Sequence, residues 1–168
     1  MPAVDTAFVY PGGCLLEGTN ISEGRGTTRP FEQFGAPFID GVVLCEELNE
    51  MKLPGCRFRY VEFQPTSGKW MGEICQGAFV HVLNRQSFRP FETYLSVLWQ
   101  IRRLFGSALV WKQGPYEYEY EKRPIDIIVG NGWLIEELDA GRPLAEIGSR
   151  YEEGLGGIRD ELDAAKLY

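Results

Sequence analysis

The sequence has one histidine, few basic residues and no long hydrophobic run. A single histidine in 168 residues excludes most histidine-based triads, dyads and zinc sites. The 17 basic side chains against 24 acidic ones leave a net charge of −7. This balance argues against a nucleic-acid partner, because phosphate binding depends on clustered Lys and Arg. No run reaches the roughly 18 apolar residues that a membrane-spanning helix requires, so we predict no membrane insertion.

Cysteine is also scarce, and its spacing excludes the common metal and disulfide frameworks. Cys14, Cys45, Cys56 and Cys75 form no C-x-x-C pair and are too few for a disulfide scaffold. We expect them to be mostly buried thiols, with a disulfide as the main alternative. The sequence therefore predicts no metal site and no cofactor.

The beginning of the chain shows no signal peptide, because no charged segment followed by an apolar stretch is present. Met1 and Pro2 lead almost at once into residues 6–10, a β-prone run that predicts a short strand. So abrupt a start is typical of the second half of a longer protein that has been cut at a domain boundary. The compartment of the protein is left unassigned.

Hydrophobic residues make up 44% of the chain and aromatic residues 13%, which is enough for a folded core. The pattern predicts an α+β fold, a single mixed domain over residues 1–168 with strands interspersed with helices. Ser87 is a candidate cap for one helix, Gly106 should end it, and glycines at 154–157 should kink the last helix. Strands are predicted at 6–10, 57–64, 77–84 and 115–121, and helices at 38–51, 91–105, 133–139 and 143–166.

Residues 11–37 are predicted to form a long irregular stretch rich in glycine. Loops of more than about 12–15 residues are uncommon in compact domains and are usually functional or disordered. Phe31, Phe34 and Phe38 should anchor this one to the core, which favours a functional loop.

The polar residues of this stretch concentrate in its middle. Two guanidinium groups in a glycine-rich loop are suited to binding an anion. The alternative is a loop held together by its own Glu–Arg and Asn–backbone bonds. A nucleotide-binding P-loop is excluded, because residues 24–27 lack the lysine and the glycine spacing. The polar candidates within residues 17–32 are Glu17, Asn20, Ser22, Arg25, Thr27 and Arg29.

Other candidates lie outside this loop. His81 alternates with two valines in a predicted strand, which favours a core or cleft-wall histidine over a general base. Lys69 and Trp70, in a turn between strands, are a lesser candidate for a binding pair. Asp126 interrupts an apolar run and needs a partner if it is buried, for which Arg25 or Arg29 would serve.

Residues 115–121 alternate Tyr and Glu with period two, so the predicted strand has an aromatic face. That face either stacks against sugar rings or packs on a neighbouring helix, and packing is the favoured interpretation. Glu17 and Glu23 are the only carboxylates that the sequence nominates as a pair for glycoside hydrolysis.

Several of these motifs together resemble the bacterial exo-β-N-acetylmuramidase family, formerly a domain of unknown function. The resemblance rests on residues 9–12 (VYPG), 14–20 (CLLEGTN), 24–27 (GRGT) and 30–32 (PFE), with Ser22 between them. It covers nearly the whole chain. The likeness continues through residues 35–37, 53–55, 69–75, 81–82, 89–90, 116–117 and 124–126.

Members of this family are longer than this chain. They join a Rossmann-like N-terminal half to a C-terminal half, with the active site in the cleft between the two. This chain resembles only the C-terminal half of such a two-domain enzyme, and the family's catalytic glutamates belong to the other half. The resemblance therefore implies that the chain contains no catalytic residue of its own and hydrolyses nothing alone.

The resemblance further implies a role in peptidoglycan recycling. The chain would be the substrate-binding half of a glycoside hydrolase that releases terminal N-acetylmuramic acid, with residues 17–32 lining the inter-domain cleft. This sugar carries a lactyl carboxylate that N-acetylglucosamine lacks, so Arg25 or Arg29 is expected to bind it. Glu17, Asn20 and Ser22 would bind sugar hydroxyls or the acetamide, or hold the arginines. Thr27, Lys69 and His81 complete the expected set.

The expected partners are peptidoglycan fragments that contain N-acetylmuramic acid and the Rossmann-like half of the same protein. The alternative is a stand-alone module that binds cell-wall sugars or a protein without catalysis. A complete enzyme built around Glu17, Glu23 and His81 is the least favoured interpretation.

Overall fold

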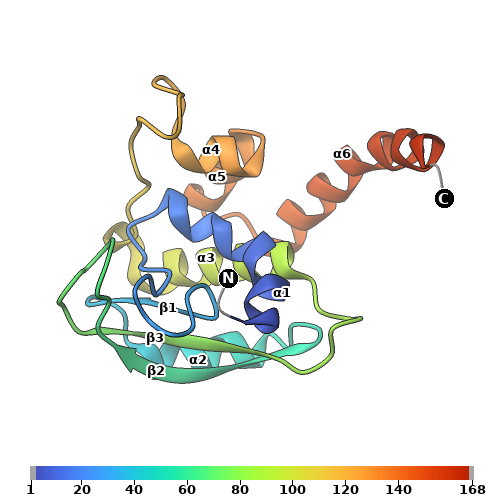
Figure 1. Cartoon of the computed structure of the whole chain (residues 1–168). Coiled ribbons are helices and arrows are strands. Elements are labelled where there is room, and N and C mark those ends of the chain that lie inside the picture. The colour runs from blue at the N-terminus through green and yellow to red at the C-terminus, as the bar shows by residue number, and fades with distance from the viewer. Residues whose placement is uncertain (1–2, 167–168) are drawn as a thin grey trace.

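The order of the elements places a small sheet among helices (Figure 1). The computed structural model describes residues 3–166, without the side chains of residues 157, 159 and 160. Helices and a three-stranded antiparallel sheet of order β1–β3–β2 form one domain, which confirms the predicted α+β class. The strands are β1 (Gln33–Ala36), β2 (Cys56–Phe63) and β3 (Cys75–Val82), and the helices are α1 (Val4–Gly13), α2 (Gly41–Glu50), α3 (Pro90–Phe105), α4 (Pro124–Val129), α5 (Trp133–Asp139) and α6 (Leu144–Ala165).

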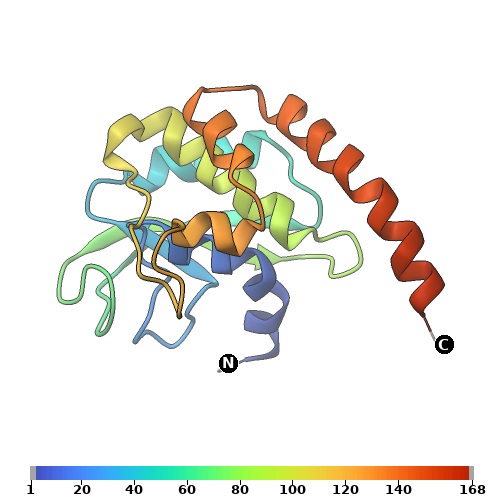
Figure 2. The same cartoon turned by 90° about the horizontal axis from the view of Figure 1, so that it is seen from above.

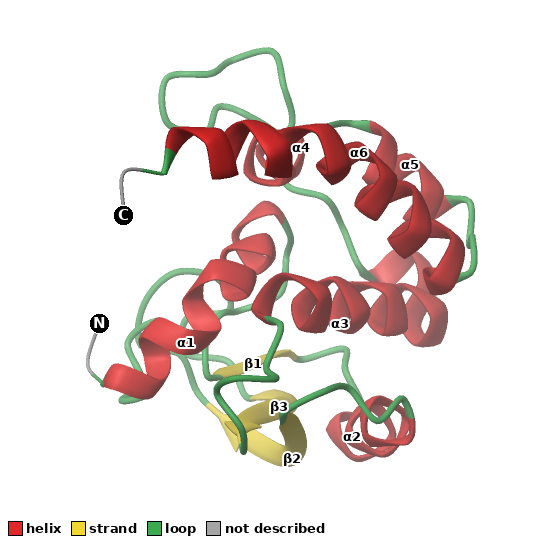
Figure 3. Cartoon of the chain, turned by 90° about the vertical axis from the view of Figure 1, so that its right-hand side faces the viewer, coloured by secondary structure: helices red, strands yellow, loops and turns green. Residues whose placement is uncertain are grey.

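The sheet has one buried and one partly exposed face. Because β2 and β3 pair along their whole length, Phe58 lies opposite Val80 and Arg59 opposite Phe79. Phe58 and Val80 are buried in the core, whereas Arg59 is exposed on the other face, as the alternation of side chains in a strand requires. Helices α1 and α3 lie side by side above the sheet in Figure 3.

The N-terminal segment is a helix, so the strand predicted at residues 6–10 is wrong. Thr6 and Val9 are fully buried one helical turn apart. Gly12 lies so close to α3 that an added Cβ atom would come 2.0 Å from the carbonyl oxygen of Pro90. The β-prone composition of this segment is therefore outweighed by its packing on α3.

The stretch at 11–37, which was predicted to be irregular, contains more regular structure. It holds the last turn of α1, the 3₁₀ helix η1 (Cys14–Gly18) and all of β1. Its aromatic anchors are confirmed: Phe31 and Phe34 are buried, and Phe38 packs against the core. Isolated pairing of Ser22 with Gly35 joins the remaining loop to β1.

The strand predicted at 115–121 is also wrong. The backbone N–H groups of Tyr116 and Glu119 each donate to the other residue's carbonyl oxygen at 3.0 Å, so the segment folds back on itself. Tyr118 and Tyr120 are 92% and 76% exposed. The favoured interpretation of a packed aromatic face therefore fails for these two rings, because no strand or helix within residues 3–166 covers them.

Two helices differ from the sequence-based prediction: α3 at its first residue and α6 at its glycines. Arg89, not Ser87, precedes the first turn of α3, and Pro90 is its first residue; Gly106 follows its end as expected. Helix α6 runs without interruption through residues 154–157. The helix extends away from the body at that point (Figure 2).

The four cysteines confirm the prediction of mostly buried thiols. Cys45, Cys56 and Cys75 are buried, Cys14 is half-buried, and all four are unpaired. Burial raises the pKa of both Cys45 and Cys75 to about 11. Among residues 3–166, no helix combines the length and the apolar character needed to cross a bilayer.

Close approach of the backbone at Gly77 generates the first testable prediction. An added Cβ atom at Gly77 would come 1.9 Å from the carbonyl oxygen of Phe34 on β1. We expect Gly77→Ala to lower the free energy of unfolding by about 1–3 kcal/mol, because the paired strands must move apart. Chemical denaturation measures this change.

The matched control is Gly154→Ala, since nothing lies within 4 Å of a Cβ atom built there. This substitution removes a glycine from an exposed helix and should raise stability by about 0.5–1 kcal/mol. Equal stabilities for the two variants would contradict the argument from close approach.

Candidate functional site

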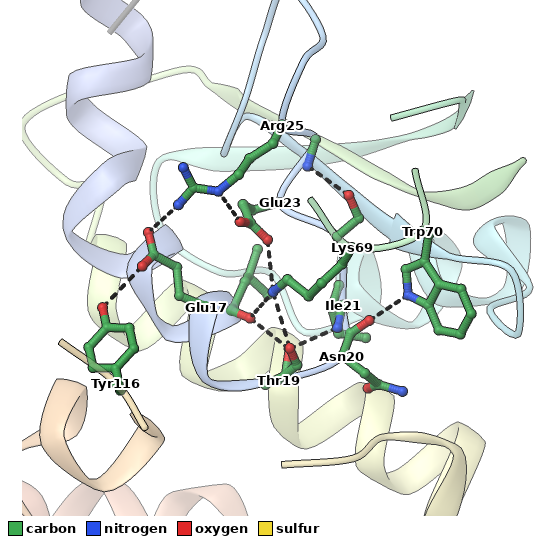
Figure 4. A network of polar contacts seen from close by, with 12 residues as sticks. Glu17, Thr19, Asn20, Ile21, Glu23, Arg25, Lys69, Trp70 and Tyr116 are labelled. Atoms are coloured by element: carbon green, nitrogen blue, oxygen red, sulfur yellow. Dashed lines mark hydrogen bonds and ion pairs between the residues drawn. The ribbon is translucent and has the colours of Figure 1, made fainter. Parts of the chain in front are cut away.

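The glycine-rich segment is organised by four charged side chains (Figure 4). Arg25 donates from Nη2 to Glu17 at 2.9 Å and from Nε to Glu23. Lys69 Nζ lies 2.8 Å from the second oxygen of Glu23. Two cations and two carboxylates thus form one connected and electrically balanced network.

Glu23 and Lys69 form the buried part of this network. The Glu23 side chain is only 4% exposed. Burial by itself would raise the pKa of Glu23, but the charge and hydrogen bond of Lys69 and the hydrogen bond of Arg25 outweigh it and lower the pKa. Burial lowers the pKa of Lys69, and Glu23 opposes that effect. Glu23 is therefore ionised at neutral pH and fixed in place.

Lys69 also ties the loop to the rest of the chain. Its ammonium group donates to the carbonyl oxygens of Leu16 at 2.8 Å and Thr19 at 3.1 Å. The neighbouring Trp70 donates from its indole nitrogen to the carbonyl oxygen of Asn20. The predicted Lys69–Trp70 pair therefore contacts the backbone of the candidate segment.

Three of the predicted site residues use their side chains to fold the loop. Asn20 donates to the carbonyl oxygen of Ala108 and accepts from the N–H of Val110. Ser22, which is buried, accepts from the N–H of Gly24. Thr27 donates to the carbonyl oxygen of Gly24. These contacts match the alternative of a loop held together by its own bonds, and a role of these residues in binding stays a prediction.

An open cavity of about 560 Å³ lies against the network, and we call it the Arg25 cavity. Two aromatic rings belong to its lining, and the ring of Tyr10 meets that of Phe31 edge-on at 4.9 Å between centroids. The lining also carries polar groups and charges of both signs. The lining includes Thr6, Tyr10, Glu17, Arg25, Pro30 and Phe31.

Tyr116 closes the Glu17 side of the network. Its hydroxyl donates to Glu17 at 3.1 Å. Burial and the nearby Glu17 raise the pKa of Tyr116 to about 12, so the hydroxyl keeps its proton at neutral pH. Glu17 accepts from both Arg25 and Tyr116, and this pairing fixes the orientation of its carboxylate.

A second open cavity, of about 270 Å³, contains the other two predicted site residues, and we call it the His81 cavity. Arg29 Nη1 lies 3.1 Å from Glu32, and Glu32 accepts a hydrogen bond of 2.6 Å from Thr6. The His81 ring packs against that of Phe79 at 4.8 Å. The lining includes Asp5, Val9, Arg29, Glu32, Phe79 and His81.

The structure thus separates residues that the sequence could not separate. Glu17 and Arg25 line one cavity, whereas Arg29 and His81 line the other. A catalytic centre of Glu17, Glu23 and His81 is not formed. Asp126 pairs with Arg123 at 2.7 Å, so the expected partners Arg25 and Arg29 are wrong.

Sequence reasoning missed several lining residues. Thr6 and Tyr10 belong to α1, where a spacing of four residues places them on one side of a helix; their assignment to a strand hid that relation. Ser67 comes from a distant turn, and no local signal marks it. Among the described residues, no three His, Cys, Asp or Glu side chains gather closely enough to hold a metal ion.

Comparison with protein families gives a match over residues 8–168 to the model described as exo-β-N-acetylmuramidase NamZ, C-terminal. The chain is 42% identical over 156 residues to the peptidoglycan β-N-acetylmuramidase NamZ of Bacillus subtilis (strain 168). The aligned part covers 92% of this chain and 36% of that relative. The chain therefore spans about a third of the length of its curated relative.

Two crystal structures of DUF1343 family proteins from Bacteroides fragilis NCTC 9343 share the fold. One superposes with a TM-score of 0.81 at 23% identity and covers 96% of this chain and 42% of the other. The second gives a TM-score of 0.63 at 19% identity, covering 98% and 41%. At these identities the likeness concerns the fold alone.

The buried ion pair predicts a large effect of Lys69→Met on stability. Removing the cation leaves Glu23 buried with Arg25 as its remaining charged partner, and we expect unfolding to become easier by about 3 kcal/mol. The double variant Lys69→Met/Glu23→Gln should recover part of this loss. The control Lys166→Met breaks an exposed pair with Asp163 and should cost less than about 0.5 kcal/mol. Denaturant titrations compare the four proteins, and a Lys69→Met effect as small as the control's would contradict the prediction.

The lowered pKa of Glu23 predicts a pH dependence. Its ordinary value is 4.5, so on acidification the unfolded chain takes up this proton before the folded chain does. The stability that Glu23 contributes is present above that value and is lost as the pH falls through the lower pKa of the folded state. The stability difference between wild type and Glu23→Gln should therefore be largest at neutral pH and shrink as the pH falls below 4.5. A difference that grows on acidification would show that the sign is wrong.

Proposed function

The chain belongs to the family of exo-β-N-acetylmuramidase NamZ C-terminal domains, and we propose that it is the substrate-binding half of a glycoside hydrolase acting on peptidoglycan sugars. In this proposal, residues 17–32 line the cleft between this domain and a Rossmann-like half. The terminal N-acetylmuramic acid residue binds in the Arg25 cavity. The whole enzyme releases that residue from the end of the glycan.

The Arg25 cavity is the observation that carries the proposal. Its volume of about 560 Å³ lies in the range of small-molecule sites, which combine apolar walls with a few convergent polar groups. Phe31 and Tyr10 offer ring edges and faces for the apolar side of a sugar. Glu17 offers carboxylate oxygens that accept from hydroxyl groups.

The network supports binding in preference to chemistry. A glycosidase needs a carboxylic acid that carries a proton near neutral pH, which requires a raised pKa. The pKa of Glu23 is lowered instead, and its side chain is buried behind Arg25. Glu17 is held by Arg25 and Tyr116. We therefore assign the catalytic acid and base to the part of the enzyme that this chain does not include.

The test is the binding of N-acetylmuramic acid to the purified 168-residue chain, measured by isothermal titration calorimetry. We expect saturable binding, weakened about tenfold or more in Glu17→Gln, because a hydrogen bond to a charged acceptor is lost. The matched control is Glu50→Gln at the exposed end of α2, which should leave the affinity unchanged. Absence of binding to the wild-type chain would overturn the proposal.

A parallel assay separates a binding half from a complete enzyme. The chain is incubated with a chromogenic N-acetylmuramic acid β-glycoside, and no release of the chromophore above background is expected. Release that disappears in Glu17→Gln would instead place a catalytic carboxylate within this chain.

A further inference from the structure

We infer that Arg29, and not Arg25, recognises the lactyl carboxylate that distinguishes N-acetylmuramic acid from N-acetylglucosamine. The inference rests on the proposed function and deepens it. It assigns the sugar ring to the Arg25 cavity and the carboxylate of its substituent to the adjoining His81 cavity.

Arg25 is poorly suited to bind a further anion. Two carboxylates, Glu17 and Glu23, already accept from its guanidinium group. With Lys69 included, the network contains two positive and two negative charges. A ligand carboxylate placed beside Arg25 would therefore meet the negative charge of Glu17 in the same cavity.

Arg29 retains most of its capacity to donate. Its Nη1 atom alone contacts Glu32, and Nε and Nη2 have no partner among residues 3–166. Its side chain is 44% exposed and reaches the His81 cavity. A guanidinium group with Nε and Nη2 unpaired presents two parallel N–H donors, the arrangement that binds a carboxylate in two-point fashion.

The surroundings of the His81 cavity carry an excess of positive charge. Arg85 pairs with Asp5 at 2.8 Å and neutralises its carboxylate. Arg29 neutralises the carboxylate of Glu32 in the same way. Arg59 adds a further cation: its Nε lies 3.3 Å from Nε2 of His81, and its guanidinium group lies 5.4 Å from the ring centre of Phe79. Arg29 and the two carboxylates belong to the lining itself, whereas Arg85 and Arg59 only contact lining residues. Three arginines against two carboxylates leave one net positive charge in and next to the cavity, which a ligand carboxylate would balance.

Consecutive residues of two segments line the two cavities, which places the cavities next to each other in this proposal. In α1, Asp5 lines the His81 cavity and Thr6 lines the Arg25 cavity. In the loop, Arg29 lines the His81 cavity and Pro30 lines the Arg25 cavity. The hydrogen bond from Thr6 to Glu32 lies at this division. A substituent on a sugar ring in one cavity is thus directed over the Thr6–Pro30 boundary towards Arg29.

The experiment measures the affinities of the 168-residue chain for N-acetylmuramic acid and for N-acetylglucosamine, in wild type and in variants. We expect Arg29→Gln to weaken binding of N-acetylmuramic acid about tenfold or more and to change that of N-acetylglucosamine less than about twofold. Arg29→Lys, which keeps the charge but loses the two-point geometry, should fall between the two. Arg25→Gln should weaken both sugars alike, because it releases Glu17.

Two further variants control for charge and folding. Arg103→Gln removes a cation that pairs with Glu47 and lines neither cavity, so it should leave the ratio of the two affinities unchanged. Arg29→Gln/Glu32→Gln removes the buried carboxylate together with its partner, so it tests the role of Arg29 without an unpaired charge. Thermal unfolding verifies that each protein is folded.

The outcomes separate the two proposals. If wild type binds neither sugar, the proposed function fails and the inference fails with it. If wild type prefers N-acetylmuramic acid and the Arg29 variants keep that preference, the inference is overturned while the proposed function stands. Loss of the preference in Arg25→Gln alone would assign the carboxylate to Arg25.

Discussion

The candidate site depends on the buried ion pair between Glu23 and Lys69. Lys69 follows β2 and reaches the carbonyl oxygen of Leu16, 53 residues earlier in the chain, while its charge compensates Glu23. Lys69 thereby joins its own turn to the glycine-rich segment. Without it, the carbonyl oxygens of Leu16 and Thr19 would lose a hydrogen-bond donor and the buried carboxylate of Glu23 would lose a cation. Because Glu23 is fixed, Arg25 is fixed, and Arg25 in turn orients Glu17 at the edge of the cavity.

Glycine makes this arrangement possible at two positions of the loop. Gly24 and Gly26 have φ angles of +70° and +77°, a region that other residues rarely adopt. At Gly26 an added Cβ atom would also come 2.1 Å from Oγ1 of Thr66. The chain can therefore turn on both sides of Arg25 and press against the turn that carries Lys69.

The sequence predicts those elements in which the spacing of apolar residues follows the side that is buried. Helix α3 has apolar residues at helical spacing over sixteen positions, and β2 and β3 alternate between two faces, so each pattern identified its element. The strand predictions at residues 6–10 and 115–121 were wrong, because β-prone residues form a strand only where a partner strand is available. The polar composition of residues 17–32 predicted a charged cluster. The division of that cluster between two cavities depends on α1, and the sequence analysis missed this helix because it assigned residues 6–10 to a strand.

That division explains why two arginines four residues apart are not equivalent. Residues 25–29 run along the boundary between the cavities, so each side chain meets a different set of neighbours. Arg25 meets Glu17 and Glu23 and is occupied with holding the loop. Arg29 meets only Glu32 among the described carboxylates and keeps donors to spare. A single loop thus combines a cation that maintains the structure with a cation that is available to a ligand. The number of carboxylates around each guanidinium group distinguishes the two arginines. That number depends on the folded structure and cannot be read from the composition of the loop.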